Sequence, residues 1–79
     1  MVISRQNQKM DSTELLQKIG KKIKSLREGK GITQQELAAL CNFEKSNMSR
    51  IEAGRTNITV ATLYTISNAL EVKIEEMFL

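Results

Sequence analysis

Two short amphipathic segments follow each other directly in residues 33–54, with only a few residues between them. The first begins at Thr33 with the sequence TQQE, a capping box in which the threonine and glutamate side chains each accept a hydrogen bond from the other's backbone N–H. Asn42 follows the first segment, and asparagine tolerates left-handed backbone geometry better than other non-glycine residues. Gly54 ends the second segment. The pattern predicts two short helices, over about residues 33–41 and 45–53, joined by a tight turn at Asn42.

The second of these helices is expected to present a polar face to the outside. A projection at about 100° per residue puts Met48 and Ile51 on its buried side. The opposite arc is short, polar and cationic, and comprises Lys45, Ser46, Ser49 and Arg50. Serines allow close approach to a groove, and an arginine can donate two hydrogen bonds to O6 and N7 of a guanine. Such an arc is typical of a helix that lies in the major groove of DNA.

The first helix of the pair offers a different contact. Gln34 lies in its first turn, where unpaired backbone N–H groups and the helix dipole favour a phosphate. Its apolar face is expected to be buried, with Leu40 at the edge of a set formed by Leu37, Ala38 and Cys41. The pair therefore predicts a helix-turn-helix, with one helix straddling the DNA backbone and the other in the groove.

Apolar residues at helical spacing predict a helix before this pair. Asp11 and Glu14 form a capping box at its start, and Gly29 and Gly31 end it. Its buried stripe comprises Leu16, Ile19, Ile23 and Leu26. Lysines lie largely off that stripe, where a solvated face is favoured over direct phosphate contact: Lys18, Lys21, Lys22 and Lys24.

Two more helices are predicted after the pair. Thr59 caps the first of them, whose expected buried stripe comprises Val60, Leu63, Ile66 and Leu70. The last is short, begins near Ile74, and carries Met77 and Phe78. The sequence thus predicts an all-α fold of five helices in one domain over residues 11–79, preceded by a flexible arm over residues 1–10.

Composition limits the classes of protein to which the chain can belong. It has 79 residues, no proline and no histidine, and its single cysteine, Cys41, permits neither an internal disulfide nor a zinc site built from cysteine and histidine. No stretch is apolar enough for a signal peptide or a membrane span, so a soluble cytoplasmic protein is expected. Residues 1–70 carry eleven basic and six acidic side chains, and an excess of positive charge attracts polyanions such as nucleic acids.

The stretch RxxKGITQQELA…SRIEAGRTN resembles the Cro and phage-repressor class of helix-turn-helix proteins, also called the xenobiotic-response-element type. The resemblance covers about residues 15–78. It implies a compact lambda-repressor-like DNA-binding domain, in which the second and third helices form the helix-turn-helix. Family positions in the two helices are matched by Ala38, Met48 and Ile51, and the family's turn position is matched by Asn42.

The resemblance also implies roles for particular residues. Base contacts fall on Lys45, Ser46, Ser49 and Arg50. Contacts to the DNA backbone fall on Thr33, Gln34, Asn47, Arg55, Thr56 and Asn57. A buried ion pair between Arg27 and Glu52 is expected to hold the helices in register. Members of the class usually bind as dimers, and the apolar residues Met77, Phe78 and Leu79 are the candidate interface, although Met77 and Phe78 could instead close the core of the monomer.

Several residues have two interpretations. Glu44 opens the third helix, either as a weak cap favoured by the helix dipole or as a residue that rejects wrong sequences or accepts a hydrogen bond from a cytosine. Cys41 is expected in the core rather than as a redox sensor. Tyr64 is either a packing residue or part of a dimer seam. Arg5 and Lys9 in the arm could reach around DNA, but a disordered terminus is favoured.

The leading function is sequence-specific binding of double-stranded DNA as a homodimer that regulates transcription, more often by occluding polymerase than by activating it. The alternative is a protein-interaction module, such as an antitoxin or an adaptor, on the same fold. No nucleophile and base pair can be named, so an enzyme is rejected. No cofactor, metal, membrane or small-molecule ligand is expected. Control is expected to come from the protein's own concentration and dimerisation.

Overall fold

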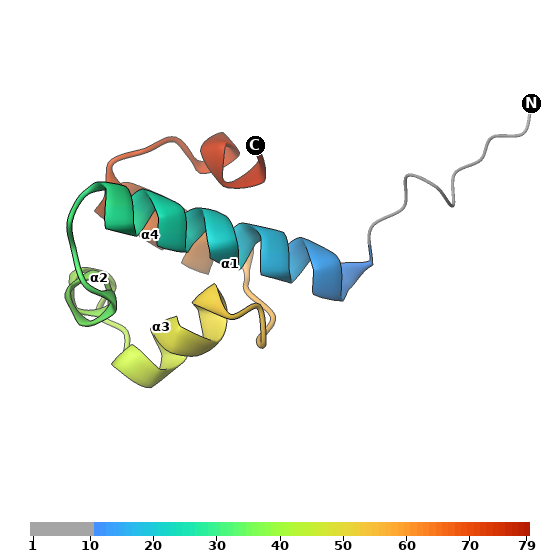
Figure 1. Cartoon of the computed structure of the whole chain (residues 1–79), viewed down its shortest axis with the longest axis horizontal. Coiled ribbons are helices and arrows are strands. Elements are labelled where there is room, and N and C mark those ends of the chain that lie inside the picture. Colours follow the sequence, from blue (N-terminus) through green and yellow to red (C-terminus); the bar gives the residue numbers. More distant parts are fainter. Residues whose placement is uncertain (1–10) are drawn as a thin grey trace, which may run out of the picture.

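The computed structural model describes residues 11–79, which form four α-helices and one 3₁₀ helix in the order α1 (Ser12–Gly29), α2 (Gln34–Cys41), α3 (Lys45–Glu52), α4 (Val60–Leu70) and η2 (Ile74–Phe78). The predicted arm, with Arg5 and Lys9, lies outside the described residues. In Figure 1, α2 and α3 lie on one side of α1, and η2 lies on the other. The described chain is all-helical, as predicted.

The last element corrects the expectation of a fifth α-helix. Residues Ile74–Phe78 form a 3₁₀ helix, in which the N–H of Glu76 donates to the carbonyl of Lys73 at 3.0 Å. A five-residue segment is too short to offset the entropic cost of nucleating an α-helix, whereas short 3₁₀ turns are common as terminal elements. The segment still packs against α1 and α4, through the fully buried Met77.

The ends of α1 and α2 are where the local signals place them. Each begins with a capping box, Asp11 with Glu14 for α1 and Thr33 with Glu36 for α2. Gly31 has a φ of 71° after α1, a value in the left-handed region that glycine adopts without steric cost. Asn42 takes the left-handed conformation after α2, with φ 60° and ψ 39°, so the turn predicted at Asn42 is confirmed.

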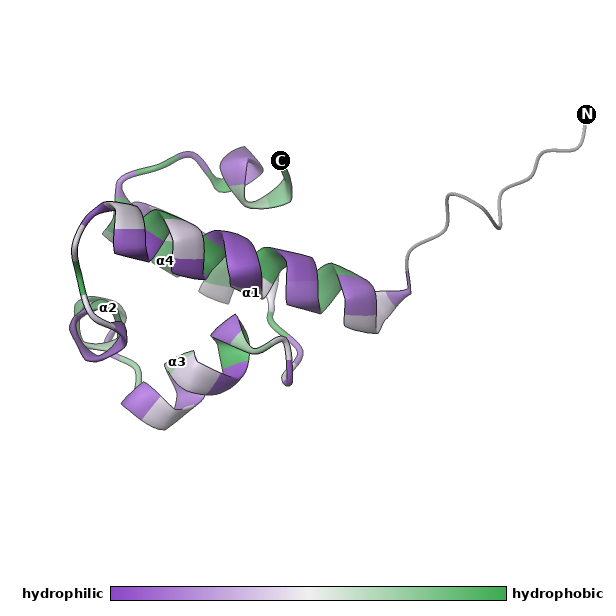
Figure 2. Ribbon diagram, viewed as in Figure 1, coloured by the Kyte–Doolittle hydropathy of each residue, from purple (hydrophilic) through white to green (hydrophobic). Residues whose placement is uncertain are grey.

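The core lies where the helices meet and is almost entirely aliphatic. Its buried side chains are Ile19, Ile23, Leu37, Ala38, Cys41, Met48, Ile51, Leu63, Ile66, Leu70 and Met77. Figure 2 shows the corresponding alternation of apolar and polar bands along α1. Val60 is an exception to the predicted stripe of α4, because 75% of it is exposed. It is the first residue of the helix, whose buried residues begin at Leu63.

Gly20 sets the distance between α1 and α3. A Cβ built on this residue would lie 2.6 Å from the carbonyl oxygen of Ile51 and would also clash with the carbonyl oxygen of Glu52. The backbones of the two helices therefore meet directly at this point. The contact brings the end of α3 against the middle of α1 and fixes the position of the site described next.

Candidate nucleic-acid interface

The outer face of α3 carries polar side chains that have no partner among the residues that the structure describes. Lys45, Ser46, Ser49 and Arg50 are exposed, while Met48 and Ile51 are buried beneath them. Within residues 11–79, none of the four exposed side chains forms a hydrogen bond or an ion pair. Asn47, expected to contact the backbone of DNA, is half-buried on the same helix. The structure thus presents the four expected base-contacting residues together on one free surface.

A buried carboxylate joins three helices behind this surface. Arg27 of α1 donates to Glu52 of α3 through Nε, at 2.7 Å from Oε2, and through Nη2, at 3.1 Å from Oε1. The Nη1 of Arg27 donates to the carbonyl oxygen of Ile32 at 2.9 Å. The hydrogen bond to Glu52 raises the pKa of the Arg27 guanidinium, so the guanidinium stays charged. Since both residues are buried, this ion pair fixes the relative position of α1 and α3.

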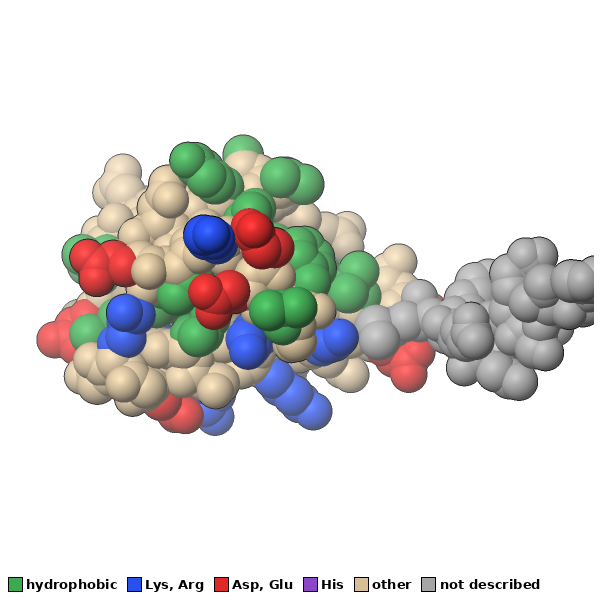
Figure 3. Space-filling view, turned by 90° about the horizontal axis from the view of Figure 1, so that it is seen from above, with side chains coloured by type: hydrophobic (Ala, Val, Ile, Leu, Met, Phe, Trp, Pro, Cys, Tyr) green, Lys and Arg blue, Asp and Glu red, His purple; other side chains and the backbone are tan. Residues whose placement is uncertain are grey.

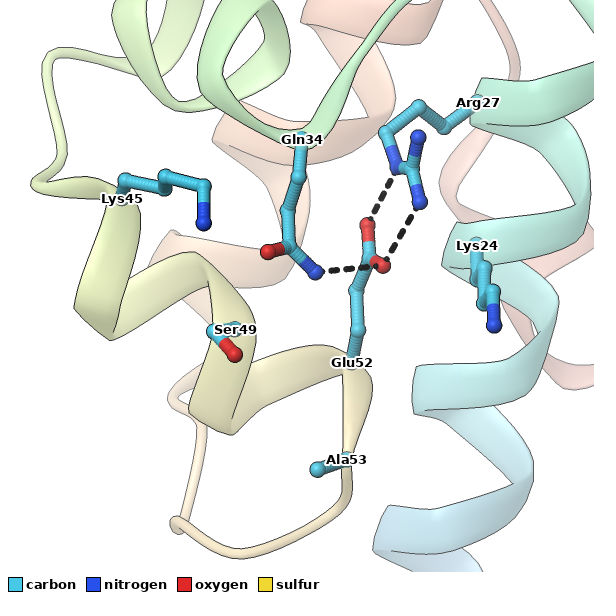
Figure 4. A pocket seen from close by; sticks show the side chains of 7 residues that line it. All are labelled: Lys24, Arg27, Gln34, Lys45, Ser49, Glu52 and Ala53. Carbon is cyan, nitrogen blue, oxygen red and sulfur yellow. Dashed lines mark hydrogen bonds and ion pairs between the residues drawn. The ribbon is translucent and has the colours of Figure 1, made fainter.

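Gln34 completes the network in a way that the sequence did not indicate. Its Nε2 donates to Oε1 of Glu52 at 2.9 Å, so α2 is tied to the same carboxylate. Figure 4 shows the amide of Gln34 between Glu52 and Lys45, with its oxygen turned away from the carboxylate. An amide NH₂ has two hydrogens, so one remains for an external acceptor.

The first turn of α2 adds further donors beside Gln34. The hydroxyl oxygen of Thr33 accepts a hydrogen bond from the N–H of Glu36 at 3.0 Å. The N–H of Thr33 in turn donates to the carboxylate oxygen Oε1 of Glu36 at 2.8 Å. Within the described part of the chain, the N–H groups of Gln34 and Gln35 have no such acceptor, as expected for the first residues of a helix. Backbone donors at a helix N-terminus suit an anionic oxygen.

An open pocket of about 440 Å³ lies where α1, α2 and α3 meet. Figure 4 shows its lining residues, which are Lys24, Arg27, Gln34, Lys45, Ser49, Glu52 and Ala53. Lys24 is exposed, as expected of the solvated lysines, and it lies on the side of α1 that faces the helix pair. The signal that could have found it is its position three residues before Arg27, which lies on the same side of the helix.

The loop after α3 extends the polar surface. Arg55 and Asn57 are exposed, and Thr56 is half-buried with its hydroxyl donating to the carbonyl oxygen of Asn57 at 3.4 Å. Gly54 allows the chain to turn away from α3 with a φ of 71°. These three residues follow α3 directly, so they lie at the opposite end of that helix from Lys45.

Other residues singled out in the sequence have clear positions. Glu44 is the N-cap of α3, and its side chain makes no capping hydrogen bond. Cys41 is buried, and this burial raises the pKa of its thiol.

The residues of the expected dimer interface differ in their exposure. Met77 is fully buried in the core and so cannot form a direct contact with a partner, which corrects its place in the expected interface. Phe78 and Leu79 remain 47% and 77% exposed. Tyr64 is 55% exposed on α4.

The part of the chain that the structure describes offers little else for chemistry. Residues 11–79 contain no group of three His, Cys, Asp or Glu side chains placed to hold a metal ion. None of the helices found there combines the length and the apolar character that a membrane crossing requires.

Comparisons with known proteins identify the family. The family model for the helix-turn-helix matches residues 23–77. The chain is 41% identical over 59 residues to an uncharacterized HTH-type transcriptional regulator, y4dJ, of Sinorhizobium fredii, covering 75% of this chain and 77% of that protein. It is 32% identical over 56 residues to the immunity repressor protein of Bacillus phage phi105, covering 71% of this chain and 39% of that repressor.

A solved structure agrees with this result. The restriction-modification controller protein C.AhdI from Aeromonas hydrophila superposes with a TM-score of 0.78 at 30% identity, covering 80% of this chain and 96% of that one. The resemblance predicted from the sequence is therefore confirmed. The chain belongs to the helix-turn-helix family of the Cro and phage-repressor type, a family of DNA-binding regulators of transcription rather than enzymes.

Proposed function

We propose that this protein is a repressor that binds a specific double-stranded DNA site as a homodimer. The observation that carries the proposal is the outer face of α3, where two cationic and two hydroxyl side chains are exposed and free of partners within residues 11–79. Side chains held by no internal contact are available to bases, and a helix of this size fits the major groove. In this arrangement α2 and α3 are the helix-turn-helix, and residues 11–79 act as one DNA-binding domain.

The residues divide into two groups by the part of DNA that each would contact. Lys45, Ser46, Ser49 and Arg50 would reach base edges. Backbone contacts would come from Thr33, Gln34, Asn47, Arg55, Thr56 and Asn57, which lie in the first turn of α2, on α3 and in the loop after it. Phosphate contacts fix the register of the protein on the duplex, and base contacts supply the sequence preference.

A homodimer would present two copies of α3 to one face of the duplex. Two half-sites about 34 Å apart then lie one helical turn from each other. Since Met77 is in the core, the exposed residues that remain for the interface are Phe78 and Leu79, together with Tyr64 on α4. Repression would follow from occupation of a promoter by such a dimer.

Fluorescence anisotropy of a labelled mixed-sequence duplex, measured over a series of salt concentrations, tests the proposal first. The logarithm of the association constant is expected to fall linearly with the logarithm of the salt concentration, because each neutralised phosphate releases counterions. Selection of a preferred site would then report the half-site spacing. Absence of binding even at low salt would contradict the proposal and would favour a protein partner.

Arg50→Ala tests base contact directly. The variant is expected to lose about 1–3 kcal/mol of binding free energy at one base position of the selected site and to relax the preference there. Arg55→Ala is the matched comparison, since it removes an exposed arginine from the loop rather than from the outer face of α3. If Arg50→Ala weakens binding equally for all sequences, Arg50 contacts only phosphate.

A further inference from the structure

Lys24 and Lys45 come from different helices and line the same pocket. Lys24 is on α1 and Lys45 is the first residue of α3. In Figure 4 the two lysines lie on opposite sides of the pocket, with Gln34 and Glu52 between them. The structure thus places a cation on α1 beside residues to which a DNA contact has already been assigned.

The charge of the pocket is positive despite the carboxylate at its floor. Arg27 neutralises Glu52 through two hydrogen bonds, and both of these residues are buried. Neither lysine has an acidic partner within residues 11–79, and both are exposed. An anion at this site would therefore meet two unpaired ammonium groups, while the one nearby carboxylate is already satisfied.

The pocket is open to the surface, so it can receive an anionic group carried by a larger ligand. The side chains of Ser49 and Ala53 are small and leave the mouth open. Gln34, in the first turn of α2, lines the pocket and has one amide hydrogen beyond the one given to Glu52. Because Lys45 and Ser49 belong both to the pocket and to the outer face of α3, a duplex held against α3 would also cover the pocket.

We propose that this pocket receives one phosphate of the DNA backbone, and that Lys24 of α1 binds it together with Lys45 and Gln34. The inference rests on the proposed function and extends it, because it assigns a DNA contact to α1, outside the helix-turn-helix. Such a contact strengthens binding without sequence preference, since a phosphate is the same at every base pair. It also couples the orientation of α1, fixed by Arg27 and Glu52, to the position of the DNA.

Lys24→Gln tests the proposal, and Lys22→Gln is its control. Both residues lie on α1 and carry the same charge, but Lys22 is about 200° around the helix from Lys24 and outside the pocket. Affinity for the selected duplex and for a mixed-sequence duplex is measured against salt concentration for both variants. Thermal melting of each variant verifies that it is folded.

Lys24→Gln is expected to reduce the salt slope of log K by about 0.9 for each protomer, the value for one phosphate on duplex DNA, and so by about 1.8 for a bound homodimer. It should weaken binding to both duplexes by the same factor, and Lys24→Arg should restore the slope. Lys22→Gln should leave the slope at the wild-type value. Equal slopes for wild type, Lys24→Gln and Lys22→Gln would overturn the inference while leaving the proposed function intact, whereas failure of the wild-type protein to bind any duplex would overturn both.

Discussion

At the scale of single residues, the carboxylate of Glu52 is the point on which three helices depend. It accepts two hydrogen bonds from Arg27 of α1 and one from Gln34 of α2, and it belongs to α3 itself. The buried negative charge of Glu52 is tolerated because the guanidinium of Arg27 and the amide of Gln34 both bind it. The same bonds hold Gln34 in place at the surface proposed to contact DNA, so Glu52 positions a residue for which we propose a phosphate contact.

Replacement of Arg27 by methionine should destabilise the protein by about 3–5 kcal/mol, because it leaves the carboxylate of Glu52 buried without its counter-charge. The double variant Arg27→Met with Glu52→Leu should be more stable than Arg27→Met alone, since neither charge then remains buried. Urea unfolding followed by circular dichroism measures both changes. Additive effects of the two substitutions would show that the pair does not act as a unit.

Gly20 gives a second prediction at this scale. Gly20→Ala should lower the free energy of unfolding by about 1–3 kcal/mol, because the added methyl group would overlap the carbonyl oxygens of Ile51 and Glu52. Gly29→Ala is the control, since a Cβ there meets nothing within 4 Å. That substitution should stabilise the helix by about 0.5–1 kcal/mol. Thermal or urea unfolding measures the stability of both variants. If Gly20→Ala were more stable than the wild-type protein, the close contact between α1 and α3 would be contradicted.

At the scale of elements, α3 has the least local support at its start among the four α-helices in residues 11–79. The N-caps of α1, α2 and α4 each accept a backbone hydrogen bond through a side chain, whereas Glu44 makes none. A glutamate carboxylate is one methylene farther from the backbone than that of aspartate, which is a preferred N-cap. The helix proposed to read DNA is therefore held mainly by packing of Met48 and Ile51 and by the bonds to Glu52.

Glu44→Asp should stabilise the protein by about 0.5–2 kcal/mol, because it adds the missing capping hydrogen bond without a change of charge. Glu44→Gln removes the charge and adds no capping hydrogen bond, so it separates the effect of the cap on stability from the effect of the charge on DNA recognition. Urea unfolding tests the cap, and anisotropy with selected and mixed duplexes tests recognition. A lower preference for the selected site in Glu44→Gln would mean that Glu44 takes part in discrimination, whereas an equal preference leaves it as a weak cap.

The helices themselves could be predicted from the sequence because their signals are local. Capping boxes, glycines and Asn42 act within a few residues of the ends that they determine. The bond from Gln34 to Glu52 could not be derived in this way, because it depends on how two helices pack. The place of Lys24 in the pocket and the contact at Gly20 also depend on packing, although each residue carried a local signal. An isolated glycine inside a helical pattern is itself a signal of close approach, and Gly20 carried that signal.

At the scale of the whole molecule, four of the exposed apolar side chains in residues 11–79 lie on α4 or at the end of η2, whereas Leu15 on α1 and Leu40 on α2 are exposed elsewhere. Val60 and Tyr64 are neighbours on α4, while Phe78 and Leu79 are at the end of η2, which packs against α4. Figure 3 looks onto the side of the molecule that carries η2 and shows apolar side chains at its surface among charged ones. The proposed homodimer would cover part of this surface and leave both copies of α3 free.

Tyr64→Glu should shift the protein from dimer to monomer, because the proposed interface would bury a charge in place of an aromatic ring. Leu40→Glu is the control, since Leu40 is 63% exposed on α2, and α2 does not contact η2 within the described residues. Sedimentation equilibrium over a range of protein concentrations measures the association of both variants. On DNA, Tyr64→Glu should keep its affinity for one half-site but lose cooperative binding to two half-sites on the same duplex. If Tyr64→Glu associates as strongly as the wild-type protein while Leu40→Glu does not, the dimer uses the surface around α2 and the assignment to α4 and η2 is wrong.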